Sequence, residues 1–184
     1  MSEPVLLFSG PPRSGKSTVA RKIAESFNLH YISPGEILKE LASDEKVGFH
    51  TYFSAIPDDV LREIVDTGLE LIQEGGYVID GRFEPLVCRQ RGIFVPAIYI
   101  TADFEVRAER EAGVAKVPLE TARKTLMERE IAEISFCRRL FHGDYRDLDL
   151  YIGTIDTAEL GPGQVYDAAI ALLREKGFLR TPHE

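Results

Sequence analysis

The chain has 184 residues, a net charge of −8, 44% hydrophobic residues and 28% charged residues. This length predicts a single domain over residues 1–184 with enough apolar residues to bury a core. The acidic balance disfavours nucleic-acid binding, and no apolar window is long enough for a membrane span. The chain has two cysteines, Cys88 and Cys137, and its start lacks the features of a secretory signal, so we expect a cytoplasmic protein without disulfides.

Apolar runs and helical periods alternate along the chain. In order, the pattern predicts a strand over 4–9, a helix over 16–27, a strand over 29–32, a helix from Pro34, a loop-like stretch over 42–56, a helix over 57–74, strands over 77–80 and 94–101, a helix from Asp103 to about Glu111, a helix over 119–141, a strand over 151–156 and a helix over 165–176. Strands that alternate with helices predict an α/β fold of three layers, with a parallel sheet between helices.

A glycine-rich segment follows the first predicted strand. Residues 10–17 read GPPRSGKS and fit the phosphate-binding pattern G-x-x-x-x-G-K-[ST] between a strand and a helix. Backbone N–H groups of such a loop face phosphate oxygens, Lys16 is expected to reach the β- and γ-phosphates, and Ser17 to offer its hydroxyl to Mg²⁺. The predicted ATP-binding residues are Gly10, Pro11, Pro12, Arg13, Ser14, Gly15, Lys16, Ser17 and Thr18. The absence of an NKxD motif disfavours a switch GTPase and favours a small kinase.

Polar residues follow the third predicted strand, at the edge of an open α/β sheet where ligands bind. Asp80 could hold a Mg²⁺-bound water or form a buried turn. Arg82 could bind the phosphate of an acceptor bidentately, or form a surface ion pair. Ten of the 15 arginines lie between Arg82 and Arg146, and they could form an anion-binding cluster or a salt-bridged helix face.

Several stretches, in family order, resemble the archaeal-type cytidylate kinases within the P-loop nucleoside-monophosphate kinase family. They are FSGPPRSGKSTVARKIAE, YISPGEILKELA, YVIDGR, AIYITADFEVRAER, MERE and YIGTIDT. The resemblance implies a five-stranded sheet in the order 2-3-1-4-5, an acceptor-binding region over about residues 33–75 and a short helical lid over about residues 103–143. It also implies transfer of the γ-phosphoryl group of ATP to CMP or dCMP with Mg²⁺. We expect small nucleotides as partners and a monomer or weak dimer.

The resemblance also implies site residues. Lys16, Arg110 and Arg129 would neutralise the transferring group, and Arg13 is a further catalytic candidate. The implied substrate-binding residues are Ser33, Lys39, Asp80, Arg82 and Arg138. Ser17, and Asp80 through a water, would hold the metal.

Arg13 is unusual, because many kinases of this class have glycine at a position whose backbone can need positive φ. A non-glycine residue in that conformation costs about 1–2 kcal/mol. Some thymidylate kinases resemble the chain here, with G-x-x-R-x-G-K-[ST], and use the arginine on the transferring group. Arg13 could therefore contact the phosphoryl group or point outward into solvent.

The chain departs from the family in the acceptor and lid regions. Lys39 stands where arginine is usual, Pro34 replaces a small residue, Glu111 stands where the family has a second lid arginine, and the stretch after Arg82 does not continue as G-R-L-A. Two alternatives therefore stay open. One is a P-loop kinase of another acceptor, such as AMP or a small metabolite, and the other is a nucleotide-binding protein without catalytic activity.

Overall fold

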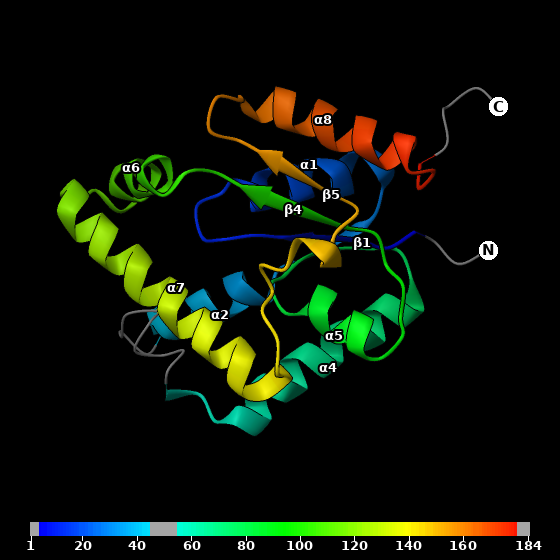
Figure 1. The fold of residues 1–184 in the computed structure, drawn as a ribbon, viewed down its shortest axis with the longest axis horizontal. Helices are drawn as coiled ribbons and strands as arrows, with labels where there is room; N and C mark the ends of the chain where they lie inside the picture. The colour runs from blue at the N-terminus through cyan, green and yellow to red at the C-terminus, as the bar shows by residue number, and fades with distance from the viewer. Residues whose placement is uncertain (1–3, 45–54, 180–184) are drawn as a thin grey trace.

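The computed structural model describes residues 4–44 and 55–179. Its centre is a parallel five-stranded sheet (Figure 1). The strands are β1 (Leu6–Ser9), β2 (His30–Ile32), β3 (Tyr77–Asp80), β4 (Ala97–Thr101) and β5 (Gly153–Asp156). Their order is β2-β3-β1-β4-β5, so the predicted fold class and strand order are confirmed.

Helices connect the strands as the periodicity predicts. They are α1 (Lys16–Phe27), α2 (Pro34–Asp44), α4 (Asp58–Glu74), α5 (Glu84–Gln90), α6 (Phe104–Ala115), α7 (Leu119–Phe141) and α8 (Pro162–Glu175), with a 3₁₀ turn at Leu148–Leu150. The short α5 and the 3₁₀ turn are additions to the predicted elements, and α6 ends at Ala115 rather than at about Glu111. The predicted loop 42–56 begins later than expected, because α2 continues to Asp44, and its residues 45–54 lie outside the described part of the chain.

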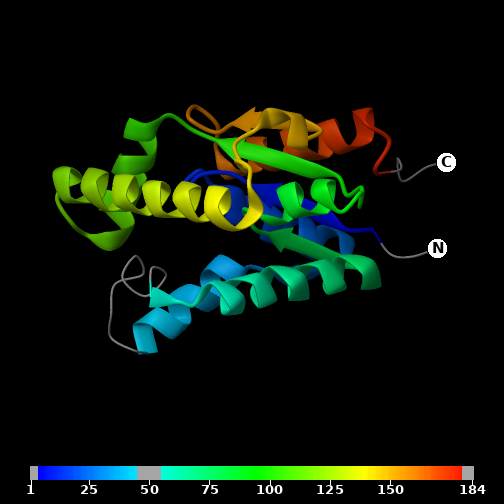
Figure 2. The same ribbon diagram turned by 60° about the horizontal axis from the view of Figure 1, so that its bottom comes forward.

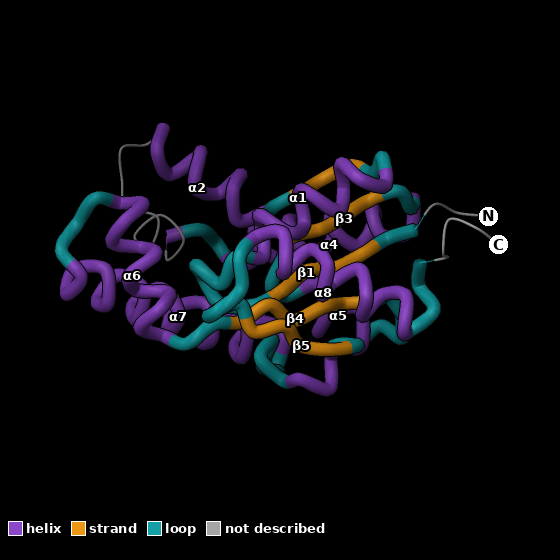
Figure 3. Tube along the Cα trace, turned by 90° about the horizontal axis from the view of Figure 1, so that it is seen from above, coloured by secondary structure: helices purple, strands orange, loops and turns teal. Residues whose placement is uncertain are grey.

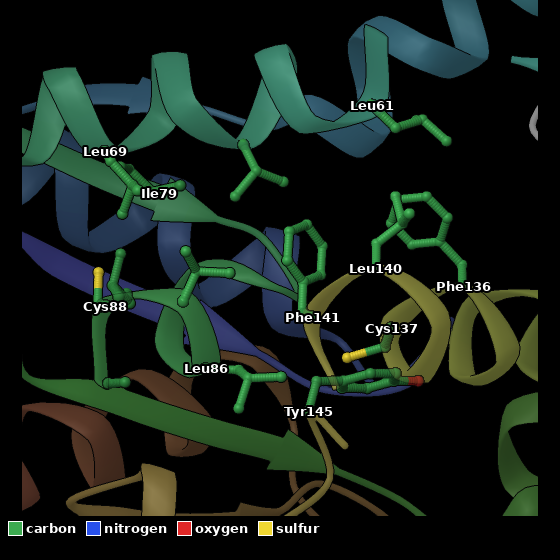
Figure 4. Packing of buried hydrophobic residues seen from close by; sticks show 14 of the residues in the cluster. Leu61, Leu69, Ile79, Leu86, Cys88, Phe136, Cys137, Leu140, Phe141 and Tyr145 are labelled. Atoms are coloured by element: carbon green, nitrogen blue, oxygen red, sulfur yellow. The ribbon is translucent and has the colours of Figure 1, made fainter. Parts of the chain in front are cut away.

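Alternate side chains of the strands face two hydrophobic cores. On β1, Leu6 and Phe8 point to the core formed with α1 and α8, and Leu7 points to the core on the other face. The second core is filled from α4, α5 and the C-terminal part of α7, as Figure 4 shows for Leu69, Leu86 and Phe141, among others. The end of α7 is therefore fixed to the sheet by burial.

The carboxyl ends of the strands gather the polar parts of the chain. Figure 3 shows α2, α6 and α7 at one end of the molecule and the two chain termini at the other. The register pairs Phe8 of β1 with Asp80 of β3, so Asp80 lies beside the loop that follows β1. No helix in the described part of the chain is long and apolar enough to cross a membrane.

Candidate active site

The loop between β1 and α1 has the curled backbone that phosphate binding needs. Positive φ angles occur at Gly10 (145°), Arg13 (62°) and Gly15 (92°). A Cβ atom on Gly10 would lie 1.9 Å from the carbonyl oxygen of Ile100, so only glycine fits there. Helix α1 begins at Lys16, and its N-terminal N–H groups face the same space with the positive end of the helix dipole. The loop is thus an anion-binding site built from backbone.

Lys16, Ser17 and Asp80 meet at the mouth of this loop. Lys16 Nζ lies 3.9 Å from Asp80 Oδ1, and the Ser17 hydroxyl donates to Asp80 Oδ2 at 2.5 Å. The hydroxyl of Tyr31 donates to the same Oδ2 at 3.1 Å, and that of Ser33 at 3.4 Å. Burial, aided by the positive charge of Arg82, lowers the pKa of Lys16 to about 7. Four residues that the sequence identifies as site candidates, Lys16, Ser17, Ser33 and Asp80, thus lie together.

The same residues fit a magnesium ion. Asp80 Oδ1 is buried and has no hydrogen-bond partner among the described residues, and its carboxylate adjoins the hydroxyl of Ser17. Mg²⁺ prefers oxygen ligands, keeps several waters and is usually bound by few protein groups together with substrate phosphates. Ser17 would supply its hydroxyl to the ion, and Asp80 would hold one of its waters.

One cavity beside the phosphate loop collects most of the predicted cationic residues. Its lining includes Arg13, Lys16, Arg82, Arg110 and Arg129. The sequence alone could not distinguish an anion-binding cluster from salt-bridged helix faces, and the structure contains both. Other arginines of the same stretch form ion pairs with acidic residues at the surface, namely Arg91 with Asp66, Arg123 with Glu105, Arg139 with Asp58 and Arg146 with Asp144.

Glu133 of α7 joins two of the cavity arginines. Its Oε1 accepts a hydrogen bond from Arg129 Nε at 2.8 Å. Its Oε2 lies 2.8 Å from Arg82 Nε, in an ion pair without the alignment of a hydrogen bond. Burial alone would raise the pKa of Glu133, but the guanidiniums of Arg82 and Arg129 outweigh it and hold the pKa below its usual value. Arg82 is thus a buried residue of the site, not half of a surface ion pair.

Arg13 and Arg110 link the phosphate loop to α6. The Arg13 guanidinium pairs with Glu111, the residue that stands where the family has a second lid arginine. Arg110 donates to the backbone oxygen of Arg13 at 3.3 Å, and to Thr157 Oγ1 and O at 2.9 and 2.7 Å. Arg13 has the strained backbone that the sequence suggested, and its side chain is only partly exposed (30%).

One predicted acceptor-binding residue, Arg138, is not brought to this cavity. Arg138 is exposed (63%) and pairs with Asp144 at 3.0 Å. It lies near the end of α7, beyond the turns of this helix that reach the phosphate loop. The side chain of Lys39 lies outside the described part of the structure.

Residues of α2, α4 and α7 line a second cavity. Figure 2 shows α7 across from α2 and α4. The walls of this cavity are mostly apolar: Pro34, Gly35, Leu38, Leu61, Ile64, Val65, Phe83 and Phe136. Arg82 and Glu133 line it too, so Arg82 borders both cavities. Glu84 is also in its lining, almost fully buried, and Glu84 Oε2 has no hydrogen-bond partner among the described residues.

Glu84 and Glu133 are not among the residues predicted from the sequence. A signal for Glu133 exists, since it follows Arg129 by four residues and so shares its helix face. Glu84 sits in α5, which has only seven residues and is too short to show a helical period.

Comparison with known proteins agrees with this geometry. A family model described as an AAA domain matches residues 9–133. The chain is 29% identical to the cytidylate kinase of Methanopyrus kandleri, covering 94% of this chain and 95% of the relative. It is 32% identical to that of Pyrobaculum islandicum, covering 85% of each. A shikimate kinase structure from Bacteroides thetaiotaomicron shares the fold, with a TM-score of 0.59 and 12% identity over 94% of this chain and 98% of that one.

Sequence and structure thus both indicate a phosphate loop, a cluster of buried cations and a parallel sheet in the order 2-3-1-4-5. The family match covers more than half of the chain, and the relatives match most of its length. The chain belongs to the P-loop nucleoside-monophosphate kinase family, in the branch of the archaeal cytidylate kinases.

Proposed function

We propose that this protein is a nucleoside-monophosphate kinase that transfers the γ-phosphoryl group of ATP to CMP or dCMP. One observation carries the proposal: Arg82 borders both the cation-lined cavity at the phosphate loop and the apolar cavity under α2 and α4. A donor triphosphate and an acceptor monophosphate held in these two cavities would have their phosphates adjacent. The names of the archaeal relatives favour cytidine as the nucleoside.

The reaction asks for position and charge neutralisation rather than covalent chemistry from the protein. Pro11 and Pro12 have no backbone N–H, so the N–H groups of Gly15, Lys16 and Ser17 at the start of α1, together with the Lys16 ammonium, hold the ATP phosphates. An oxygen of the acceptor phosphate attacks the γ-phosphorus in line, and the bond from that phosphorus to the β–γ bridging oxygen breaks, so that ADP leaves. Negative charge from bound phosphates favours the protonated form of Lys16, whose pKa burial lowers to about 7.

Bound Mg²⁺ would neutralise charge on the β- and γ-phosphates. Ser17 and Asp80 are the residues that would hold it, the latter through a water. Their adjacency supports this assignment, as does Asp80 Oδ1, which is buried and has no hydrogen-bond partner among the described residues.

We assign the remaining cations by their location. Arg129 and Arg110 line the donor cavity and would neutralise the transferring group. Arg82 and Ser33 lie where the acceptor phosphate would meet the N-terminus of α2. Arg13 would turn from Glu111 to the γ-phosphoryl group, since its side chain lines the same cavity as Lys16.

The mobile lid that we propose is shorter than residues 103–143, the range that the family resemblance implies. On α6, Arg107 donates to the backbone oxygen of Pro12 at 3.2 Å, and Arg110 is tied to Thr157. On α7, Arg129 is tied through Glu133 to Arg82. We therefore propose that closure moves residues 111–128, and that the acceptor-binding region lies within residues 33–75, where α2 and α4 line the apolar cavity.

We infer a cytoplasmic setting and a monomer or weak dimer, with no nucleic-acid partner. The two cysteines, Cys88 and Cys137, are free and buried, as suits a reducing compartment. The net charge of −8 opposes general binding to polyanions.

A coupled assay of ADP release tests the function. Purified protein with ATP and Mg²⁺ is given CMP, dCMP, UMP, AMP, GMP and a set of small alcohols in separate reactions. We expect the highest kcat/KM with CMP or dCMP. Preference for AMP or an alcohol would contradict the cytidylate assignment, and the absence of release with every acceptor would indicate a nucleotide-binding protein without activity.

A further inference from the structure

We propose that Glu133 is a positioning residue of the phosphoryl-transfer site: one buried carboxylate fixes the guanidiniums of Arg82 and Arg129 so that both face the phosphates. This inference rests on the proposed kinase function. It assigns a role to a residue outside the predicted site, and it explains how the donor and acceptor cavities keep a fixed relation to each other.

Glu133 contacts Arg82 and Arg129 at the same guanidinium nitrogen, Nε. Glu133 uses its two oxygens separately, Oε1 for Arg129 and Oε2 for Arg82, each at 2.8 Å from Nε. Nε is the guanidinium nitrogen nearest the chain, so a carboxylate at Nε leaves the outer Nη groups directed further along the side chain. Nη1 of Arg82 accordingly lies 3.6 Å from the point that a Cβ atom on Gly35 would occupy. The fork of Arg82 is thus held at the N-terminus of α2, where we expect the acceptor phosphate.

Charge in the cavity requires such a partner. Lys16, Arg82 and Arg129 are all nearly buried, and the charge of Arg82 helps to lower the pKa of both Lys16 and Arg129. Without a buried counter-charge these cations would repel each other and turn toward solvent. The Glu133 side chain is only 2% exposed, so solvent screens its attraction weakly.

Stability alone is a poor reason for this arrangement. Replacing a buried ion cluster by apolar residues is often neutral or stabilising, and the wall beside Glu133 is apolar, with Phe136 on the same helix. A carboxylate that contacts two arginines on different elements fixes the direction in which their guanidiniums point, and apolar packing would not. Because Arg129 lies on α7 and Arg82 follows β3, Glu133 also couples the base of the proposed lid to the acceptor cavity.

A double-mutant cycle tests the role. Glu133→Gln and Arg82→Lys are made singly and together, and the acceptor KM, ATP KM and kcat are measured, with CMP affinity by titration calorimetry as a readout that needs no turnover. Lysine keeps the charge of Arg82 but cannot be held at one nitrogen while presenting a fork with others. We expect Glu133→Gln to raise the acceptor KM about 10-fold in the wild-type background and less than about 3-fold in the Arg82→Lys background, because coupled residues are non-additive.

Two further variants keep the test interpretable. Glu130→Gln is the matched control, because Glu130 lies on the same helix but pairs with Arg107, and it should leave the acceptor KM within about 2-fold of wild type, as expected for a site outside the coupled pair. Glu133→Asp keeps the charge on a shorter side chain that cannot reach both arginines. If Glu133→Gln does not fold, Glu133→Asp should still melt near the wild-type temperature while the acceptor KM rises.

The results of this cycle can be interpreted separately from the test of the kinase function. Turnover of CMP by the wild type tests the function by itself, and a wild type that prefers another acceptor is taken through the same cycle with that acceptor. Equal fold-changes of Glu133→Gln in both backgrounds would overturn the positioning role. Tighter acceptor binding by Glu133→Gln would also overturn it, since the carboxylate would then be a stand-in that phosphate displaces. If the wild type turns over nothing, unchanged CMP affinity in Glu133→Gln overturns it equally.

Discussion

Arg13→Gly is the substitution that separates backbone strain from charge in the phosphate loop. Arg13 has a φ of 62°, a conformation that glycine adopts at no cost. Its side chain pairs with Glu111 and lines the cavity of Lys16. The substitution therefore relaxes the backbone and removes one cation from the transferring group, and these two effects appear in different measurements.

The stability terms nearly cancel. Relief of the positive φ is worth about 1–2 kcal/mol. Loss of the partly exposed ion pair with Glu111 costs about 0–1 kcal/mol, and the greater freedom of an unfolded glycine costs about 0.5–1 kcal/mol. We expect a net change within about 1 kcal/mol, which for a chain of this size moves the melting temperature by less than about 4 °C.

The catalytic term does not cancel. A cation that contacts the γ-phosphoryl oxygens gains most when charge spreads over them in the transition state, so we expect kcat to fall about 10- to 100-fold. The assay is steady-state ADP release with both substrates saturating, alongside a thermal melt. Glu111→Gln is the matched control: it breaks the same ion pair but keeps Arg13, so kcat should be unchanged or slightly higher.

Two results would refute this reasoning. A wild-type kcat in Arg13→Gly would mean that the arginine points to solvent and that Arg110 and Arg129 neutralise the phosphoryl group without it. An equal loss of kcat in Glu111→Gln would mean that the ion pair between the loop and α6, rather than the arginine itself, is what the reaction needs.

Four further predictions concern separate parts of the site. Lys16→Ala should abolish transfer and leave the melt cooperative, because the polar side chain contributes transition-state stabilisation rather than core packing; wild-type turnover at saturating ATP would disprove the phosphate-loop assignment. Arg82→Lys should raise the acceptor KM about 10-fold or more with little change in the ATP KM, since the charge stays and the fork is lost; an acceptor KM equal to wild type would refute this. Amide exchange of residues 111–128 should slow when a bisubstrate inhibitor binds, while the amides of the buried residues Phe136, Cys137, Leu140 and Phe141 should change little; equal exchange of 111–128 in both states would exclude a lid there. Burial raises the pKa of Glu84 in the folded state, so the contribution of Glu84 to the free energy of unfolding should fall as pH rises above the unfolded pKa of about 4.3. In urea unfolding, Glu84→Gln should therefore gain stability relative to wild type between pH 5 and pH 8. A difference in unfolding free energy between variant and wild type that does not change with pH would contradict a buried acid.

The fold was predictable because its signals are local and periodic. The strand–loop–helix pattern around Gly10 and Lys16 identifies β1 and α1, and the alternation of apolar runs with helical periods gives the parallel sheet. Helix α5 was not predicted, because seven residues with a proline in the first turn show no period. The strand order came from the family resemblance, since no local signal says which strands are neighbours.

The site was predictable only where a motif fixes it. The residues of the phosphate loop and Asp80 are adjacent as expected, because β1 and β3 pair in register there. The arginines were harder, since a guanidinium looks the same in sequence whether it faces a cavity, as Arg129 does, or the surface, as Arg138 does. Tertiary packing decides between the two, and the carboxylate of Glu133 that organises the buried pair carries no motif.

The central claim is that the two cavities joined by Arg82 hold an ATP and a cytidine monophosphate for direct phosphoryl transfer. In the most direct test, wild-type protein reacts with γ-labelled ATP, CMP and Mg²⁺, and the nucleotides are then separated by anion-exchange chromatography. The Lys16→Ala protein is the matched control. We predict that label appears in CDP in step with the formation of ADP, and that it does not appear with Lys16→Ala. Release of label as free phosphate with no labelled CDP, or equal labelling of CDP by the Lys16→Ala protein, would contradict the claim.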